Sequence, residues 1–234
     1  MHPPVRDESR DGIRWIDFDD GVVNALSEAR ITELSAALDR AEAAGEVAVL
    51  RGRPGIFSAG FDLKTFQRGA EAGVALVRAG AELVLRLLAF PRPVLSVCTG
   101  HAYPAGAFLM LASDSRLGLT GPFRIGLNEV SIAMTVPRFA VELVRHRLAP
   151  AGLAQVATGR LFSPEQAVAL GYLDRVCEPD DLDAAVAEEA LRLRALDMEA
   201  FVATKARINA PAQEAIRAAI DVELATVGAP SRLD

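Results

Sequence analysis

The chain is poor in the residues that build metal centres and disulfides. Its 234 residues include two cysteines and three histidines, and none of them lie at a spacing typical of a metal site. Cys98 and Cys177 stand in apolar sequence, which favours two buried thiols over a disulfide. We therefore expect neither a bound metal nor a disulfide.

The sequence also lacks the motifs of several enzyme classes. It contains no G-x-S-x-G nucleophile elbow, no P-loop and no dinucleotide-binding fingerprint. Ser58 precedes an Ala-Gly pair, but no histidine and aspartate follow in an order that would activate it. These absences disfavour nucleophilic catalysis.

Long apolar runs and excess positive charge are missing as well. The longest apolar run, residues 105–112, is far too short to span a membrane, and the N-terminal Met-His-Pro-Pro does not resemble a signal peptide. The formal net charge of −6 and the pI of about 5.2 argue against a general nucleic-acid binder, although a local basic patch could still hold an anionic ligand. We expect a cytoplasmic protein with neither nucleic acid nor membrane as a partner.

What the sequence does have is alternating strand and helix patterns. Hydrophobic residues make up 51% of the chain, and strands alternate with helices through residue 178, which predicts an α/β core. Residues 1–12 are predicted to be a polar arm, and residues 179–234 a helical lobe without strands, helical from 182 to 227. The predicted strands cover residues 13–18, 47–50, 94–97, 116–119 and 172–177.

Capping residues mark the ends of several predicted helices. Ser27 is suited to begin a helix that ends at Gly45, and Ser163-Pro164-Glu165-Gln166 has the pattern of a capping box. That second helix is predicted to end at Gly171. Further helices are predicted over residues 71–89, 105–112, 137–148 and 151–158.

Two short segments of small residues each follow a predicted strand. They are Ala59-Gly60-Phe61-Asp62 and Pro104-Ala105-Gly106-Ala107, and the second also precedes a helix. A helix N-terminus carries unpaired N–H groups and partial positive charge, so two donors from these loops could bracket one carbonyl oxygen as an oxyanion hole. The alternative is that small residues only allow close packing.

Glu129 is the best acid/base candidate. It lies in an apolar stretch, where loss of solvation would raise its pKa and make it a better base at neutral pH. The alternative is an exposed glutamate at the end of a strand. Asp62 and Asp114 are weaker candidates, better suited to capping a helix and ordering a loop, and His101 is better suited to a structural role.

Several basic residues stand near the first small-residue segment. Arg51, Arg53, Lys64 and Arg68 could together meet phosphate groups, or they could be ordinary solvated surface.

Taken together, these segments resemble the crotonase (enoyl-CoA hydratase/isomerase) superfamily. The similar stretches are residues 24–27, 57–64, 100–106, 125–129 and 163–176, in the family's order and at its spacings, and the resemblance extends over residues 12–210. It implies a spiral of ββα units followed by the helical lobe, which in the family contributes to a trimer or a dimer of trimers. It also implies an acyl-CoA thioester as the partner and no separate cofactor, because coenzyme A is part of the substrate.

The resemblance assigns roles to individual residues. It implies that the backbone N–H groups of Phe61 and Ala105, with Gly106 as the fallback for the second, form the oxyanion hole. It places coenzyme A and the acyl group beside the residues Ala59, Gly60, Asp62, Leu63, Phe108 and Asn128. Ala105 departs from the glycine that many relatives have at this position.

Another departure concerns the reaction. Hydratases of the family use two glutamates, and the first falls at Phe108 here, which leaves Glu129 as the base. The segments Pro104-Ala105-Gly106 and Ile125-Gly126-Leu127-Asn128-Glu129 look most like those of the Δ3,Δ2-enoyl-CoA isomerases, whose reaction needs only one base. Two alternatives stay open: a hydratase or related reaction, with Glu142 or His101 replacing the missing glutamate, and a non-catalytic acyl-CoA-binding protein, in which Phe61 and Phe108 narrow the site.

Overall fold

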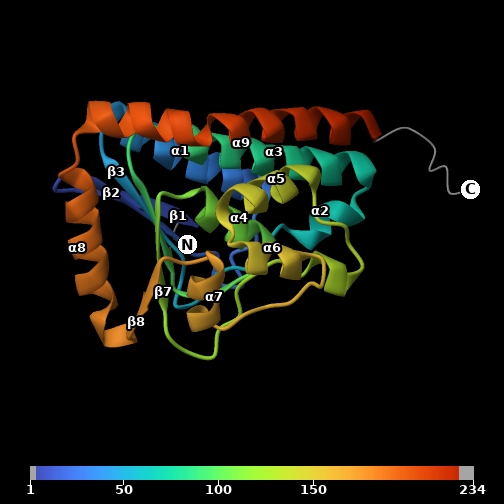
Figure 1. Cartoon of the computed structure of the whole chain (residues 1–234), viewed down its shortest axis with the longest axis horizontal. Coiled ribbons are helices and arrows are strands. Elements are labelled where there is room, and N and C mark those ends of the chain that lie inside the picture. Colours follow the sequence, from blue (N-terminus) through green and yellow to red (C-terminus); the bar gives the residue numbers. More distant parts are fainter. Residues whose placement is uncertain (1–3, 227–234) are drawn as a thin grey trace, which may run out of the picture.

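A computed structural model describes residues 4–226 (Figure 1). Its larger sheet has six strands in the order β1-β2-β3-β5-β7-β8, and β1 and β2 are antiparallel while the other neighbours are parallel. The strands are β1 (Val5–Arg10), β2 (Ile13–Phe18), β3 (Val47–Arg51), β5 (Val94–Cys98), β7 (Ser115–Leu119) and β8 (Arg175–Cys177).

The prediction of a polar arm at residues 1–12 is wrong for residues 4–12, the part of this segment that the structure describes. Val5–Arg10 is an edge strand that pairs with β2 along its whole length, and Asp11 and Gly12 form the connecting turn with φ of 53° and 70°. An edge strand needs only one side of its backbone paired and can keep most of its side chains in water, so a polar sequence conceals it. Arg14 of β2 holds Asp7 of β1 in an ion pair at 3.0 Å.

A second, two-stranded sheet stands apart from the first and was not predicted. Its strands are β4 (Gly55–Ser58) and β6 (Gly100–Ala102), which run parallel. A Cβ atom on Gly100 would lie 2.0 Å from the carbonyl carbon of Gly55, so this pairing requires a glycine. Such short, glycine-containing strands have no hydrophobic alternation to reveal them.

The two sheets are built from repeated ββα units. β3 and β4 lead into α2 (Leu63–Gln67) and α3 (Ala70–Ala89), and β5 and β6 lead into α4 (Pro104–Ala112). After β7, Ile125 forms a parallel bridge with Ala102 of the small sheet before α5 (Arg138–Arg147). Each unit therefore places one strand in the large sheet, an extended segment beside the small sheet, and a helix outside, as the expected spiral requires.

Each buried strand of the large sheet packs against helices on both faces. In β3, Ala48 and Leu50 enter the main core with α1 (Glu28–Ala44), α3 and α4, whereas Val47 and Val49 face α8 (Leu182–Arg194). This alternation follows from the two-residue period of a strand. Because both faces are covered, the sequence of the strand is almost continuously apolar.

The predicted helix caps are present. Ser27 accepts a hydrogen bond from the N–H of Arg30, and Gly45 ends α1 in the left-handed conformation at φ 68°. Ser163 and Gln166 form the capping box of α7 (Pro164–Leu170), and α6 (Pro150–Val156) precedes it. The predicted strand at 172–177 is shorter than expected, because its first residues, including Tyr172, are buried in the core beside Phe162.

The C-terminal residues form two helices that pack on the rest of the fold. After a short 3₁₀ turn (Pro179–Asp181), α8 covers one face of the large sheet, and α9 (Met198–Thr226) lies along α3 and α5 (Figure 1). Lys205 of α9 is buried and binds Asp114 at 2.7 Å. The predicted helix end at Val227 lies outside the described residues, and the division into a core and a helical lobe stays a prediction.

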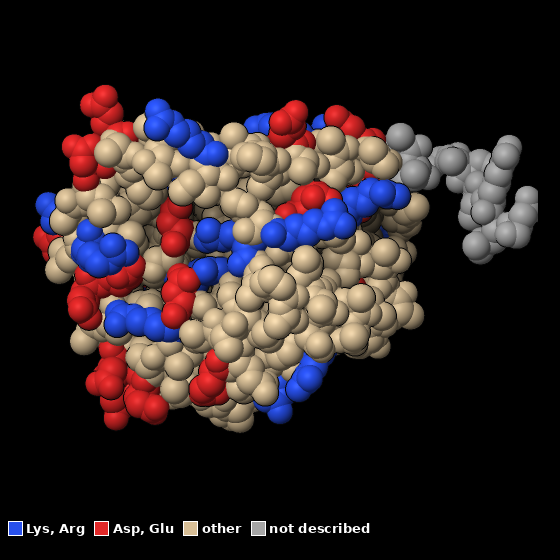
Figure 2. Space-filling view, in the orientation of Figure 1, with Lys and Arg blue, Asp and Glu red and all other residues tan. Residues whose placement is uncertain are grey.

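Charge is unevenly spread over the surface. Figure 2 shows charged side chains over α8 and along α9, whereas the surface over α6 is largely uncharged. Arg138 and Arg145 of α5 line a groove against α9. Between residues 4 and 226, no helix combines the length and the apolar character needed to cross a membrane.

Candidate active site

A pocket of about 200 Å³ opens where the small sheet meets α2, α3 and α4. It brings together residues from both small-residue segments and from the segment that carries Glu129. The predicted site residues that line it are Ala59, Gly60, Phe61, Leu63, Asn128 and Glu129. Its other lining residues are Phe66, Val77, Tyr103, Pro104, Ile132, Met134, Thr135 and Pro137.

The two predicted N–H donors lie on neighbouring loops. Gly60 has φ of 100°, and a Cβ atom on it would stand 3.7 Å from the backbone nitrogen of Ala105. Leu26 bonds to both neighbours of Phe61, because its N–H donates to the Gly60 carbonyl at 2.8 Å and its carbonyl accepts from the Asp62 N–H at 3.1 Å. This ladder leaves the N–H of Phe61 without an acceptor among the described residues.

The second donor is at the start of α4. Pro104 is the first residue of this helix and Ala105 the second, so the Ala105 N–H has no acceptor within the helix. Tyr103 docks this end on the small sheet by donating its N–H to the Ser58 carbonyl at 2.9 Å. A Cβ atom on Gly106 would lie 2.9 Å from the same carbonyl oxygen, so Gly106 allows the close packing that puts Ala105 in place.

The side chain of Phe61 is held against α3. A Cβ atom on Gly80 would lie 2.4 Å from Cζ of Phe61, so the ring rests directly on the helix backbone. The same ring lies 6.3 Å from that of Phe108, centroid to centroid. Gly80 was not singled out from the sequence. The signal that could have found it is a glycine on the apolar face of a predicted helix, because such a glycine lets another group approach the helix backbone closely.

Glu129 is a buried carboxylate without a partner. It begins a 3₁₀ turn (Glu129–Ile132), its residue is 5% exposed, and neither carboxylate oxygen has a hydrogen-bond partner within residues 4–226. Burial raises the pKa of Glu129 from 4.5 to about 7. The backbone N–H of Glu129 itself lowers this pKa in part, although it is not in hydrogen-bond geometry with the carboxylate. The group is thus divided between its two protonation states near neutral pH.

The backbone around Glu129 is fixed at both ends. Before it, Ile125 exchanges backbone hydrogen bonds with Phe162 at 3.0 and 2.9 Å. After it, Ser131 donates its hydroxyl to the Gly159 carbonyl at 3.0 Å, and the Met134 N–H donates to the Glu129 carbonyl at 2.9 Å. These bonds position the carboxylate on the pocket wall.

Other candidate residues lie outside this pocket. Phe108 is buried in the main core, 5.3 Å from the ring of Phe139, and does not line the pocket. Asp62 caps α2 by accepting from the Lys64 N–H, and Asp114 binds Lys205.

The two residues considered as replacements for a second glutamate are also engaged elsewhere. His101 accepts the Arg124 N–H at 3.0 Å through Nδ1, and Glu142 binds Arg145 at 2.7 Å. Glu129 is the one carboxylate among the lining residues of the described chain. Residues 4–226 also hold no group of three or more histidine, cysteine, aspartate or glutamate side chains suited to a metal, and Cys98 and Cys177 are free thiols.

The basic residues near the first segment divide into two pairs. Arg51 binds Asp17 at 2.7 Å, and Arg53 donates to the Val22 carbonyl at 2.8 Å. Lys64 and Arg68 are exposed on and beside α2, and neither makes an ion pair within the described residues. They adjoin the segment that lines the pocket.

Comparison with known proteins shows the family of the chain. A family model described as enoyl-CoA hydratase/isomerase matches residues 8–231. The chain belongs to the enoyl-CoA hydratase/isomerase family.

Relatives in this family cover most of the chain. A probable enoyl-CoA hydratase, echA17, from Mycobacterium avium is 35% identical over 213 residues, which span 88% of this chain and 82% of the relative. The structure of an enoyl-CoA hydratase/isomerase family protein from Pseudomonas syringae superposes with a TM-score of 0.94 at 38% identity, covering 95% of this chain and 97% of the other. An enoyl-CoA isomerase of Mycobacterium tuberculosis superposes with a TM-score of 0.91 at 38% identity, covering 95% of this chain and 98% of the other.

These likenesses confirm the expected crotonase fold and identify an enzyme of the enoyl-CoA hydratase/isomerase type. An acyl-CoA thioester is the substrate class consistent with this family.

Proposed function

We propose that the protein is a Δ3,Δ2-enoyl-CoA isomerase. The observation that carries this proposal is a single buried carboxylate, Glu129, in a pocket that Phe61 and Pro104 also line. The N–H groups of Phe61 and of Ala105, the residue after Pro104, lack acceptors among the described residues. A shift of a double bond needs one base and a place for negative charge, and this site offers both.

In the proposed reaction, the thioester carbonyl oxygen lies between the N–H groups of Phe61 and Ala105. Glu129 removes a proton from C2 of the 3-enoyl ester, and the electrons of that C–H bond move into a dienolate. The same carboxyl group then returns the proton at C4, which leaves the double bond between C2 and C3. A donor in such a site contributes roughly 2.7–4 kcal/mol to lowering the barrier.

The raised pKa suits both halves of this cycle. A base with a pKa near 7 is largely ionised just above neutral pH, and once protonated it is a stronger acid than water for returning the proton. Proton removal and return on one face of the substrate need no second acid. The apolar position of Phe108 is therefore no obstacle to this reaction.

Hydration of a 2-enoyl ester is the second candidate. It is favoured by the name of the Mycobacterium avium relative and by the polar lining residues Tyr103, Asn128 and Thr135, which could hold a water molecule. Hydration also requires a group that gives a proton to C2 while water attacks C3. Glu129 alone would have to serve both steps.

The remaining parts of the proposal concern coenzyme A and assembly. We propose that coenzyme A lies along residues 59–63, with the exposed Lys64 and Arg68 close to its phosphate groups, and that no separate cofactor is used. We also propose a trimer or a dimer of trimers to which α8 and α9 contribute.

The test is a spectrophotometric comparison of 3-hexenoyl-CoA and crotonyl-CoA as substrates. We expect the 3-enoyl ester to gain the absorbance of a conjugated 2-enoyl ester, with little loss of crotonyl-CoA absorbance. Glu129→Gln should lower this rate by at least about 100-fold while acyl-CoA binding persists, and the exposed Glu214→Gln on α9 should not. Rapid loss of crotonyl-CoA absorbance would establish hydration instead, and binding without turnover of either ester would favour a binding protein.

A further inference from the structure

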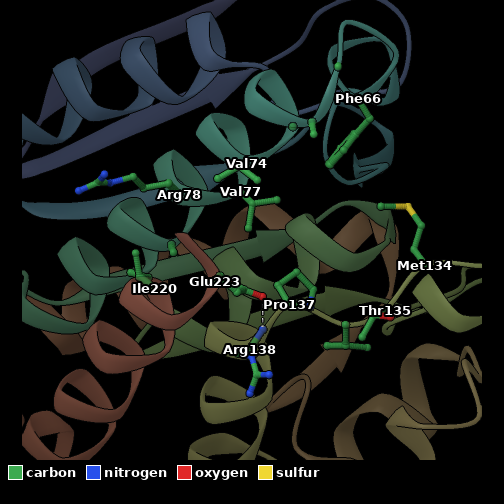
Figure 3. A pocket seen from close by; sticks show the side chains of 15 residues that line it. Phe66, Val74, Val77, Arg78, Met134, Thr135, Pro137, Arg138, Ile220 and Glu223 are labelled. Carbon is green, nitrogen blue, oxygen red and sulfur yellow. Dashed lines mark hydrogen bonds between the residues drawn. The ribbon is translucent and has the colours of Figure 1, made fainter. Parts of the chain in front are cut away.

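A second, larger pocket adjoins the candidate active site. Its volume is about 620 Å³, and it lies between α3, residues 134–138 and α9 (Figure 3). Five residues line both this outer pocket and the active-site pocket: Phe66, Val77, Met134, Thr135 and Pro137. The two pockets therefore meet at these residues, and a ligand that passes between them extends from the active-site pocket into the outer pocket.

The size of the active-site pocket makes such an extension necessary for a large ligand. Its 200 Å³ is below the roughly 300–1,000 Å³ of most small-molecule sites, whereas the outer pocket lies within that range. The inner space suits a thioester and the first carbons of an acyl group. Further carbons have to pass between Phe66 and Val77 on one side and Met134 and Pro137 on the other.

A glycine of α3 keeps Phe66 beside the helix. A Cβ atom on Gly73 would lie 2.8 Å from Cδ1 of Phe66, so a larger residue there would displace the ring. Gly73 itself lines the outer pocket. A glycine of α3 thus makes room for a phenylalanine ring at two places: Gly80 for Phe61 and Gly73 for Phe66.

Three charged residues, Arg78, Arg138 and Glu223, line the outer pocket, and the side chains of Arg78 and Glu223 make hydrogen bonds. Arg78 donates to Glu82 at 2.9 Å, and its side chain points away from the centre of the pocket in Figure 3. Glu223 of α9 accepts the backbone N–H of Arg138 at 2.6 Å. The wall between these groups is largely apolar and is formed by Phe66, Ala70, Val74, Val77, Met134, Val136, Pro137 and Ile220.

We infer that the enzyme selects acyl-CoA esters with a long acyl tail, of about ten carbons or more, and that the distal methylenes lie in this outer pocket with α9 as its far wall. The inference rests on the proposed function, because it assumes that the thioester lies in the inner pocket. Each methylene moved from water into an apolar site improves binding by up to about four-fold. Four additional methylenes therefore tighten binding by at most about 200-fold.

The experiment measures binding of two saturated esters, hexanoyl-CoA and decanoyl-CoA, by isothermal titration calorimetry, so that no turnover is needed. We expect decanoyl-CoA to bind at least about 20-fold more tightly than hexanoyl-CoA. Val74 lines only the outer of these two pockets, and Val74→Phe should reduce this ratio to below about five-fold by filling it. Ala75 is the next residue on α3, is exposed and lines neither pocket, so Ala75→Phe should keep the wild-type ratio.

The outcomes separate this inference from the proposed function. Equal binding of the two esters, or an unchanged ratio in Val74→Phe, would overturn the inference and leave the isomerase proposal standing. If neither ester binds, the acyl-CoA function fails and the inference fails with it. If a second copy of the chain covers this pocket, the two esters bind equally and Val74→Phe changes the oligomeric state in sedimentation, which also overturns the inference.

Discussion

Replacing Glu129 with glutamine should stabilise the protein while removing its activity, and the stabilisation should depend on pH. The carboxylate is buried without a hydrogen-bond partner among the described residues, so its ionised form is disfavoured in the folded chain. The pKa rises from 4.5 to about 7, and at about 1.4 kcal/mol per pKa unit the ionised group costs about 3 kcal/mol. Glutamine has nearly the same shape and carries no charge.

The direction of the pH dependence follows from proton binding. Between pH 4.5 and about 7 the folded state holds the Glu129 proton more tightly than the unfolded state, so the stability of the wild type falls as pH rises through this window. Below pH 4.5 both states are protonated and the cost is absent. The free energy of unfolding of Glu129→Gln should therefore exceed that of the wild type by about 1 kcal/mol at pH 5 and by about 3 kcal/mol at pH 8.

Urea unfolding at pH 5 and pH 8 measures this difference directly. For a chain of this length, the change of about 2 kcal/mol between the two pH values corresponds to roughly 4–8 °C in Tm. Glu214→Gln replaces an exposed glutamate of α9 and should change stability by less than about 0.5 kcal/mol at both pH values. A stability difference between Glu129→Gln and the wild type that does not change with pH would refute the argument that burial raises this pKa.

Three further predictions follow from the same geometry. In the proposed reaction Glu129 must be ionised to remove the C2 proton, so the kcat/KM for isomerisation should rise with pH and level off above about 7; a pH–rate profile flat from pH 5 to 8 would contradict this. Gly80→Ala should cost about 1–3 kcal/mol of stability and lower turnover, because the new Cβ displaces the ring of Phe61, whose N–H is a proposed oxyanion donor; chemical unfolding and kinetics of the purified variant measure both. Lys205→Met should destabilise the fold by about 3–5 kcal/mol, because it leaves Asp114 without its cation in a largely buried place, and a wild-type midpoint in urea would exclude that role.

Local signals in the sequence were sufficient for most helices and for the buried strands. Ser27 and Gly45 bound α1, and the Ser163 capping box begins α7, because capping depends on residues within one turn of the helix. The buried strands were found because continuous apolar runs of that length are typical of parallel sheets covered on both faces.

The missed strands lack the apolar pattern that marks a buried strand. β1 is polar and becomes a strand only because β2 offers it a backbone partner, and β4 and β6 pair because Gly100 lets their backbones approach. Several pocket-lining residues, such as Phe66 and Met134, were missed because they come from segments far apart in the sequence. Nothing near them in the sequence shows that α2, α3 and the segment after Glu129 meet.

By itself, the sequence determined the fold class, the two segments that carry the N–H donors and the glutamate that serves as the candidate base. Each of these depends on residue type and near neighbours. Only the tertiary structure decided that the loop of Gly60 and Phe61 lies beside Ala105 and that Glu129, without a hydrogen-bond partner among the described residues, lines a pocket together with Phe61. It also decided that a second pocket, walled in part by α9, shares some of the same lining residues. Distances between segments and the loss of solvent around a carboxylate are properties of packing, and packing is set by all the segments together.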